Sequence, residues 1–82
     1  MRIQFVRAEL ASCRTAVEMG EMELAAHNMP IAVKEVANAE KGIGVARRFL
    51  PGVAAQNRGE LESSLAEVEK RLRVLKAKVS HR

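Results

Sequence analysis

Three stretches of the sequence repeat apolar or small residues at spacings that alternate between three and four, which is the period of one face of a helix. The first stretch runs from Ile3 to His27 and the second from Met29 to Leu50. The third is the most regular, with six aliphatic residues in phase: Leu61, Leu65, Val68, Leu72, Leu75 and Val79. Because strand residues alternate with a period of two, the pattern predicts an all-α protein with helices over about 2–27, 29–50 and 59–80.

The breaks between these stretches predict how the helices are connected. Pro30 suits a first helical turn after a cap at Asn28, and Pro51-Gly52 interrupts the second stretch. Asn57 with Glu60 three residues later is typical of a capping box at the start of the third helix. Short connections between helices of matched length favour antiparallel neighbours, and 82 residues are enough for only one domain. We therefore expect residues 1–82 to form an up-down-up three-helix bundle.

Two glycines lie inside the second predicted helix and bear on whether it is continuous. Alanine recurs on its apolar face at residues 32, 39 and 46, which favours a close approach of a neighbouring helix. Gly42 and Gly44 each cost a helix interior about 1 kcal/mol relative to alanine, so a kink at Gly42–Gly44 is possible. We expect a continuous helix, because the apolar pattern keeps its phase through Ile43.

Charges in the third helix are arranged by sign along its length. Its first half carries the glutamates and its second half the lysines and arginines, as the helix dipole favours. The spacing also predicts favourable pairs within the helix, Glu67 with Arg71 and Glu69 with Arg73.

Catalytic, metal and cofactor chemistry lack a signature in the sequence. Cys13 is the only cysteine, so it excludes an intramolecular disulfide and is typical of an apolar filler in a cytoplasmic protein. Glu23, His27 and His81 could converge on zinc at one end of the bundle, but solvated histidines near helix ends are the preferred interpretation. The N-terminal residues lack the apolar core of a secretion signal, and no run is apolar enough to cross a membrane. We expect a cytoplasmic protein that is not an enzyme and binds no cofactor.

A second stripe of uncharged residues follows the far side of the first helix at the same spacing. Its members are Phe5, Ala8, Ser12, Thr15, Met19, Met22 and Ala26. The second helix adds Ile31, Val33, Val45 and Phe49 outside its main apolar face. One interpretation is that the second neighbour in the bundle covers the stripe. The other is an interaction surface, for which methionines are well suited because their side chains adapt to a partner.

A second candidate surface is a cluster of arginines. The sequence has 14 lysines and arginines against 10 acidic residues, a net charge of +4. The expected topology places the start of the first helix, the end of the second and the start of the third at one pole, which gathers arginines suited to phosphate or carboxylate. They are Arg2, Arg7, Arg47, Arg48 and Arg58. No aromatic residue lies among them to stack a base, so nucleic acid is the less favoured partner.

These observations predict a small, basic helical module for protein–protein interaction. The favoured partner is a second copy, as a homodimer, or another helical protein, held through the first helix and part of the second. The alternative is a binder of nucleic acid or another polyanion at the arginine pole.

Overall fold

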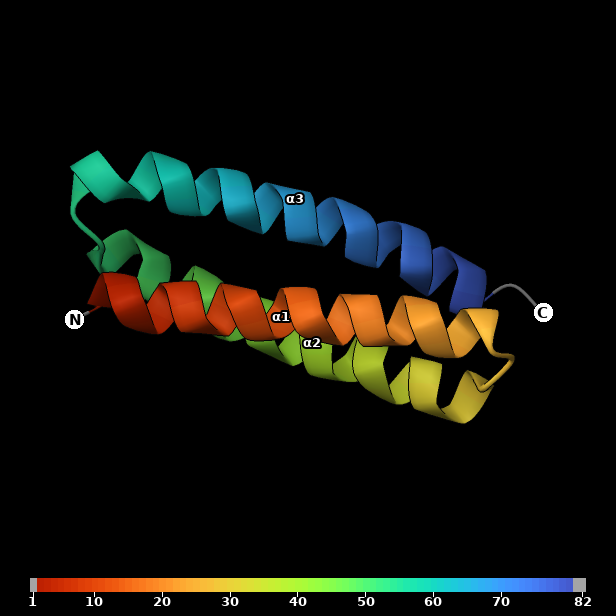
Figure 1. The fold of residues 1–82 in the computed structure, drawn as a ribbon. Helices are drawn as coiled ribbons and strands as arrows, with labels where there is room; N and C mark the ends of the chain where they lie inside the picture. The colour runs from red at the N-terminus through yellow and green to blue at the C-terminus, as the bar shows by residue number, and fades with distance from the viewer. Residues whose placement is uncertain (1, 81–82) are drawn as a thin grey trace.

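Three long helices account for nearly all of the computed structural model, which describes residues 2–80. They are α1 (Arg2–Ala25), α2 (Met29–Phe49) and α3 (Ala55–Ser80), with a single 3₁₀ turn, η1 (Leu50–Gly52), between the last two. They run up, down and up along a rod of 42 × 17 × 16 Å (Figure 1). The all-α, three-helix bundle predicted from the sequence is confirmed.

The core lies along the bundle axis and is built by the three predicted apolar faces. All six aliphatic residues of the third face are buried, as are Ala32, Ala39 and Ala46 of α2 and Val6 and Val17 of α1. Leu61, Leu75 and Val68 are among the largest side chains that are fully enclosed. Each helix thus buries one stripe at a three-and-four spacing against the other two.

α1 and α2 pack with their backbones very close together. A Cβ atom added to Gly42 would lie 2.4 Å from Cys13 Sγ of α1, and one added to Gly20 of α1 would lie 3.4 Å from Glu35 Cβ of α2. α2 is continuous through Gly42 and Gly44, so the expected continuity is confirmed and no break occurs there. The glycine that the packing requires is Gly42, because a Cβ on Gly44 would meet nothing within 4 Å.

α1 ends two residues earlier than the sequence pattern predicts. His27 adopts a left-handed backbone conformation with φ of 61°. The His27 N–H donates to the Leu24 carbonyl and the Asn28 N–H donates to the Glu23 carbonyl, at 3.0 and 2.7 Å. This is a Schellman motif with histidine where glycine is usual, and it reverses the chain into α2. Pro30 lies in the first turn of α2 as predicted, although the Asn28 side chain makes no cap bond.

α3 begins at Ala55, one turn before the predicted start at residue 59, and the predicted capping box at Asn57 is wrong. The Asn57 N–H donates to the Ala54 carbonyl, so Asn57 already belongs to the helix. Val53 is extended and buried, which anchors the connection to the core. Arg58 then donates from Nη2 to the Val53 carbonyl at 3.0 Å. These contacts bring the chain into helical geometry earlier than its local sequence indicates.

Candidate interaction surface

We call the second stripe of the first helix, from Phe5 to Ala26, the α1 stripe, although Ala26 itself lies in the turn just after α1. The α1 stripe is exposed along its whole length. Every one of its seven residues is classed as exposed, and the large side chains Phe5, Met19 and Met22 keep 44, 44 and 70% of their surface accessible. The interpretation in which a neighbouring helix of the same chain covers the stripe is therefore wrong. The reason is geometric: α2 and α3 both contact the other side of α1, where Val6, Leu10, Cys13 and Val17 are buried.

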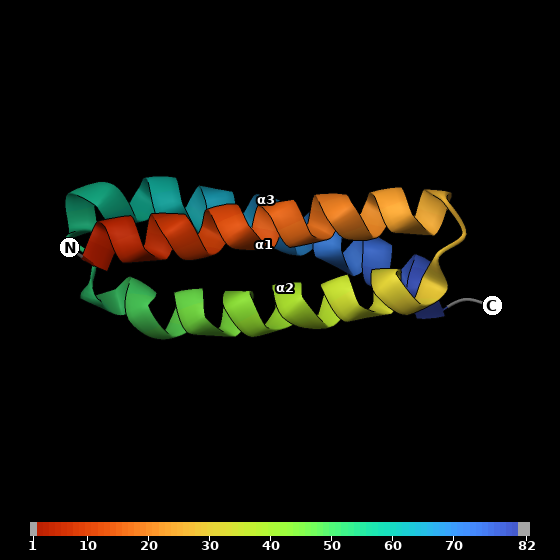
Figure 2. The same cartoon turned by 60° about the horizontal axis from the view of Figure 1, so that its bottom comes forward.

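A groove runs beside the stripe and is lined by α1 and α2 alone. It has a volume of about 390 Å³ and passes over Cys13 and Gly42 at its floor. Ser12, Thr15 and Met19 form part of one wall, and residues of α2 form the other. α1 and α2 run side by side here with α3 behind them (Figure 2). The other wall contains Glu35, Asn38, Lys41 and Val45.

An aromatic pair joins the two helices at one end of this face. The rings of Phe5 and Phe49 lie 5.1 Å apart between centroids and are inclined at 78°, an edge-to-face arrangement. Ile31 and Val33 of α2 remain 39 and 43% exposed, and Val45 and Phe49 are partly buried. Large exposed apolar side chains therefore occur on both helices; those of α1 are Phe5, Met19 and Met22, which lie on one face.

The other two sides of the bundle carry ion pairs between helices. Arg7 with Glu60 and Arg14 with Glu67 join α1 to α3, at N–O distances of 3.0 and 2.9 Å, and each pair links residues 53 positions apart. Arg71 continues this row, with Nη2 2.7 Å from Glu21 Oε1. The offset of 53 shared by the first two pairs is that of parallel helices in heptad register.

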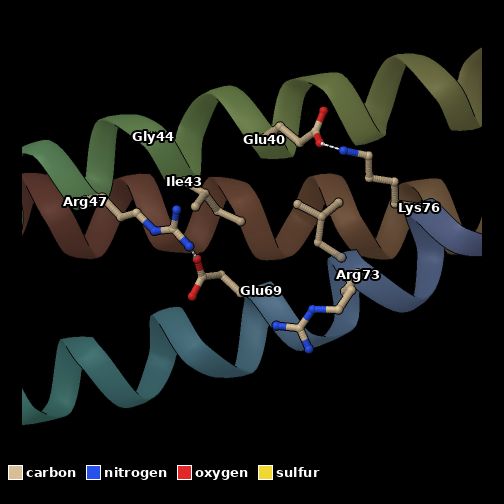
Figure 3. A pocket seen from close by; sticks show the side chains of 8 residues that line it. Glu40, Ile43, Gly44, Arg47, Glu69, Arg73 and Lys76 are labelled. Atoms are coloured by element: carbon tan, nitrogen blue, oxygen red, sulfur yellow. Dashed lines mark hydrogen bonds and ion pairs between the residues drawn. The ribbon is translucent and has the colours of Figure 1, made fainter.

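A second row of ion pairs joins α2 to α3. Arg47 pairs with Glu69, and Glu40 pairs with Lys76 across a shallow hollow (Figure 3). From the first pair to the second, the α2 residue number falls by seven and the α3 residue number rises by seven. This is the relation that antiparallel helices require. The predicted pairs within α3 therefore give way to pairs between helices, because Glu67, Glu69 and Arg71 lie where α3 meets its neighbours. Within residues 3–80, no ion pair joins α1 to α2.

The predicted arginine pole is largely engaged in contacts within the chain. Arg7 binds Glu60 through both Nε and Nη2, Arg47 pairs with Glu69, and Arg58 donates to the Val53 carbonyl. Arg48 is exposed and makes no ion pair within the described residues. The side chain of Arg2 lies outside what the structure describes. The start of α1, the end of α2 and the start of α3 do share one end of the bundle (Figure 1).

The remaining reactive side chains do not form a chemical site within the described residues. Cys13 is 2% exposed, and its Sγ lies 3.6 Å from the Ala39 carbonyl oxygen. Burial raises the pKa of the Cys13 thiol, and the Glu9 carboxylate raises it further. Residues 2–80 contain no group of three side chains placed to hold a metal ion, and His81 lies outside the described residues. None of the described helices is long and apolar enough to cross a membrane.

Comparison of the chain with protein-family models, with curated protein sequences and with solved structures finds no match. The surface itself is therefore the basis for any statement about function. Among its candidate sites, the α1 stripe with the adjoining groove combines exposure, apolar character and the absence of competing ion pairs within residues 3–80.

Proposed function

We propose that this protein is a small, non-catalytic interaction module that self-associates through α1 and the adjoining part of α2. The observation that carries the proposal is the exposure of the α1 stripe, whose large members Phe5, Met19 and Met22 lie at helical spacing on one face. Exposed apolar surface arranged in this way on a small domain is typical of a protein–protein interface. A second copy would also bury apolar surface that 82 residues cannot enclose alone.

The rest of the bundle supports the choice of face. Ion pairs follow both flanks of α3, so those flanks are occupied by contacts that set the register of the chain with itself. The α1/α2 side instead has an open groove with uncharged Ser12, Thr15 and Met19 on one wall. A partner helix could therefore approach without displacing an ion pair. The single buried cysteine is compatible with the reducing cytoplasm, which is where we place the protein.

The test is a pair of double variants that are matched in charge and spacing. Met19→Glu with Met22→Glu places two carboxylates on the stripe. Val74→Glu with Ala77→Glu places two on the exposed side of α3, again three residues apart. We expect the first variant to be monomeric and the second to keep the mass of the unmodified protein, with both remaining helical by circular dichroism. Equal effects of the two variants on mass would refute the proposed face.

Polyanion binding at the arginine pole is the alternative. The carboxylates paired with Arg7 and Arg47 reduce the positive charge that phosphates would meet, which is why this function is second. Titration with labelled DNA and RNA at two ionic strengths tests it, because such binding weakens steeply as salt rises. No binding at low salt would remove the alternative.

A further inference from the structure

The α1 stripe has a sequence of sizes that is complementary to its own reverse. Phe5 lies at one end, Met19 and Met22 lie near the other before the terminal Ala26, and the smaller residues Ala8, Ser12 and Thr15 lie between them. All of these positions follow one heptad pattern, alternating between its two apolar positions. When two copies of the stripe run antiparallel about a point between Ser12 and Thr15, each a position of one copy therefore lies opposite a d position of the other.

We infer that the partner of this face is a second copy whose α1 lies antiparallel to the first, related by a two-fold axis between Ser12 and Thr15. This inference rests on the proposed self-association and specifies its geometry. In this arrangement Phe5 meets Met22 of the second copy and Ala8 meets its Met19. The thioether of Met22 thus contacts the aromatic ring of Phe5, which is a favourable contact. The large Met19 faces the small Ala8, so the two side chains together fill the space between the helices.

The layer at the two-fold axis is polar but uncharged. Ser12 of each copy faces Thr15 of the other, so hydroxyl groups meet hydroxyl groups and can bond to each other. The parallel alternative places Phe5 on Phe5, Met22 on Met22 and Ala8 on Ala8. That alternative leaves a small layer between bulky ones, which packs less well than alternating sizes. The sizes along the stripe therefore favour the antiparallel pairing.

Two carboxylates of α1 beside the stripe are compatible with this pairing. Glu9 and Glu18 flank it on opposite sides. In an antiparallel pair, the residues on one flank of a stripe lie beside the residues on the same flank of the other copy. Glu9 then lies beside Ala16 of the second copy, and Glu18 lies beside its Ala11. The Glu9 and Glu18 carboxylates of the two copies are thus kept apart from one another, as a stable self-complementary interface requires.

Cysteine cross-linking tests the geometry. In a Cys13→Ala background, one chain carries Ala8→Cys and a second carries Met19→Cys; the two are mixed, unfolded, refolded and oxidised. We expect the mixed disulfide to exceed the like-with-like disulfides on the order of tenfold, because only facing thiols have a high effective concentration. In the antiparallel pair the two Ala8 positions lie about 16 Å apart along the axis, at 1.5 Å per residue. A dimer in which like-with-like disulfides predominate would overturn the geometry while leaving self-association intact.

A charge test keeps the inference falsifiable if the cysteines themselves weaken association. Ser12→Lys with Thr15→Glu in one chain makes each introduced lysine face an introduced glutamate of the other copy, so we expect the dimer to persist. Ser12→Lys with Thr15→Lys places like charges together and should give a monomer. Dissociation of both variants to an equal extent would overturn the antiparallel pairing. An unmodified protein that is monomeric at every concentration would refute the proposed function itself.

Discussion

Gly42 and Gly44 lie two residues apart on α2, yet the structure predicts different effects on stability of replacing them with alanine. A Cβ on Gly44 meets nothing within 4 Å, whereas one on Gly42 would lie 2.4 Å from Cys13 Sγ. Both replacements gain the same helix propensity, about 1 kcal/mol. The difference between the two variants therefore measures the closeness of α1 and α2 directly.

The expected magnitudes follow from this geometry. Gly44→Ala should stabilise the fold by about 1 kcal/mol, which for a domain of this size raises the melting temperature by about 4–8 °C. Gly42→Ala should gain that amount and lose about 1–3 kcal/mol to overpacking, because the new Cβ would lie 2.4 Å from Sγ of the buried Cys13. We expect Gly42→Ala to be neutral or destabilised by up to about 2 kcal/mol.

The measurement is urea unfolding followed by circular dichroism, with all variants at one protein concentration so that association affects them equally. Cys13→Ala removes the atom that the new Cβ would meet. In a double-mutant cycle, Gly42→Ala should therefore cost less in the Cys13→Ala background than in the unmodified chain, with a coupling energy of about 0.5–3 kcal/mol. If Gly42→Ala stabilises the unmodified chain as much as Gly44→Ala does, the account of the α1/α2 contact is refuted.

Two further predictions concern single residues. His27→Gly should stabilise the fold by about 1 kcal/mol in the same urea assay, because glycine adopts the observed φ of 61° without strain; a loss of stability would show that the histidine side chain matters more than its backbone. The raised pKa of Cys13 means that the unfolded chain loses the thiol proton at a lower pH than the folded chain. Stability should thus fall as pH rises above the unfolded thiol value of about 8.5, and the fall should be smaller in Cys13→Ala; identical pH profiles would refute burial of a neutral thiol.

The buried apolar faces could be predicted from the sequence because they depend only on the helical period. The buried face from Leu61 to Val79 could be predicted without knowing which helix packs against it, since every third or fourth residue of one helix lies on one face. The helix boundaries were harder to predict from the sequence. Val53 and Arg58 start α3 a turn early through burial and through a hydrogen bond across the connection. Neither contact has a local sequence signal.

Partner choice among charged residues was also beyond the sequence. Glu67 and Arg71 have suitable spacing within α3, but in the fold Glu67 meets Arg14 and Arg71 meets Glu21. Heptad spacing permits both arrangements, and only the positions of the neighbouring helices decide between them. The exposure of the α1 stripe was left open for the same reason. Helical spacing identifies a face, whereas three-dimensional packing determines whether another helix covers it.

We propose that the chain self-associates, and the molar mass in solution across a concentration series tests this claim. Size exclusion coupled to light scattering at low and moderate salt should give a mass near twice 9.0 kDa that declines only on dilution. Moderate salt should leave the mass unchanged, because the α1 stripe has no charged member. A mass of 9.0 kDa at every concentration and both salt levels would contradict the claim.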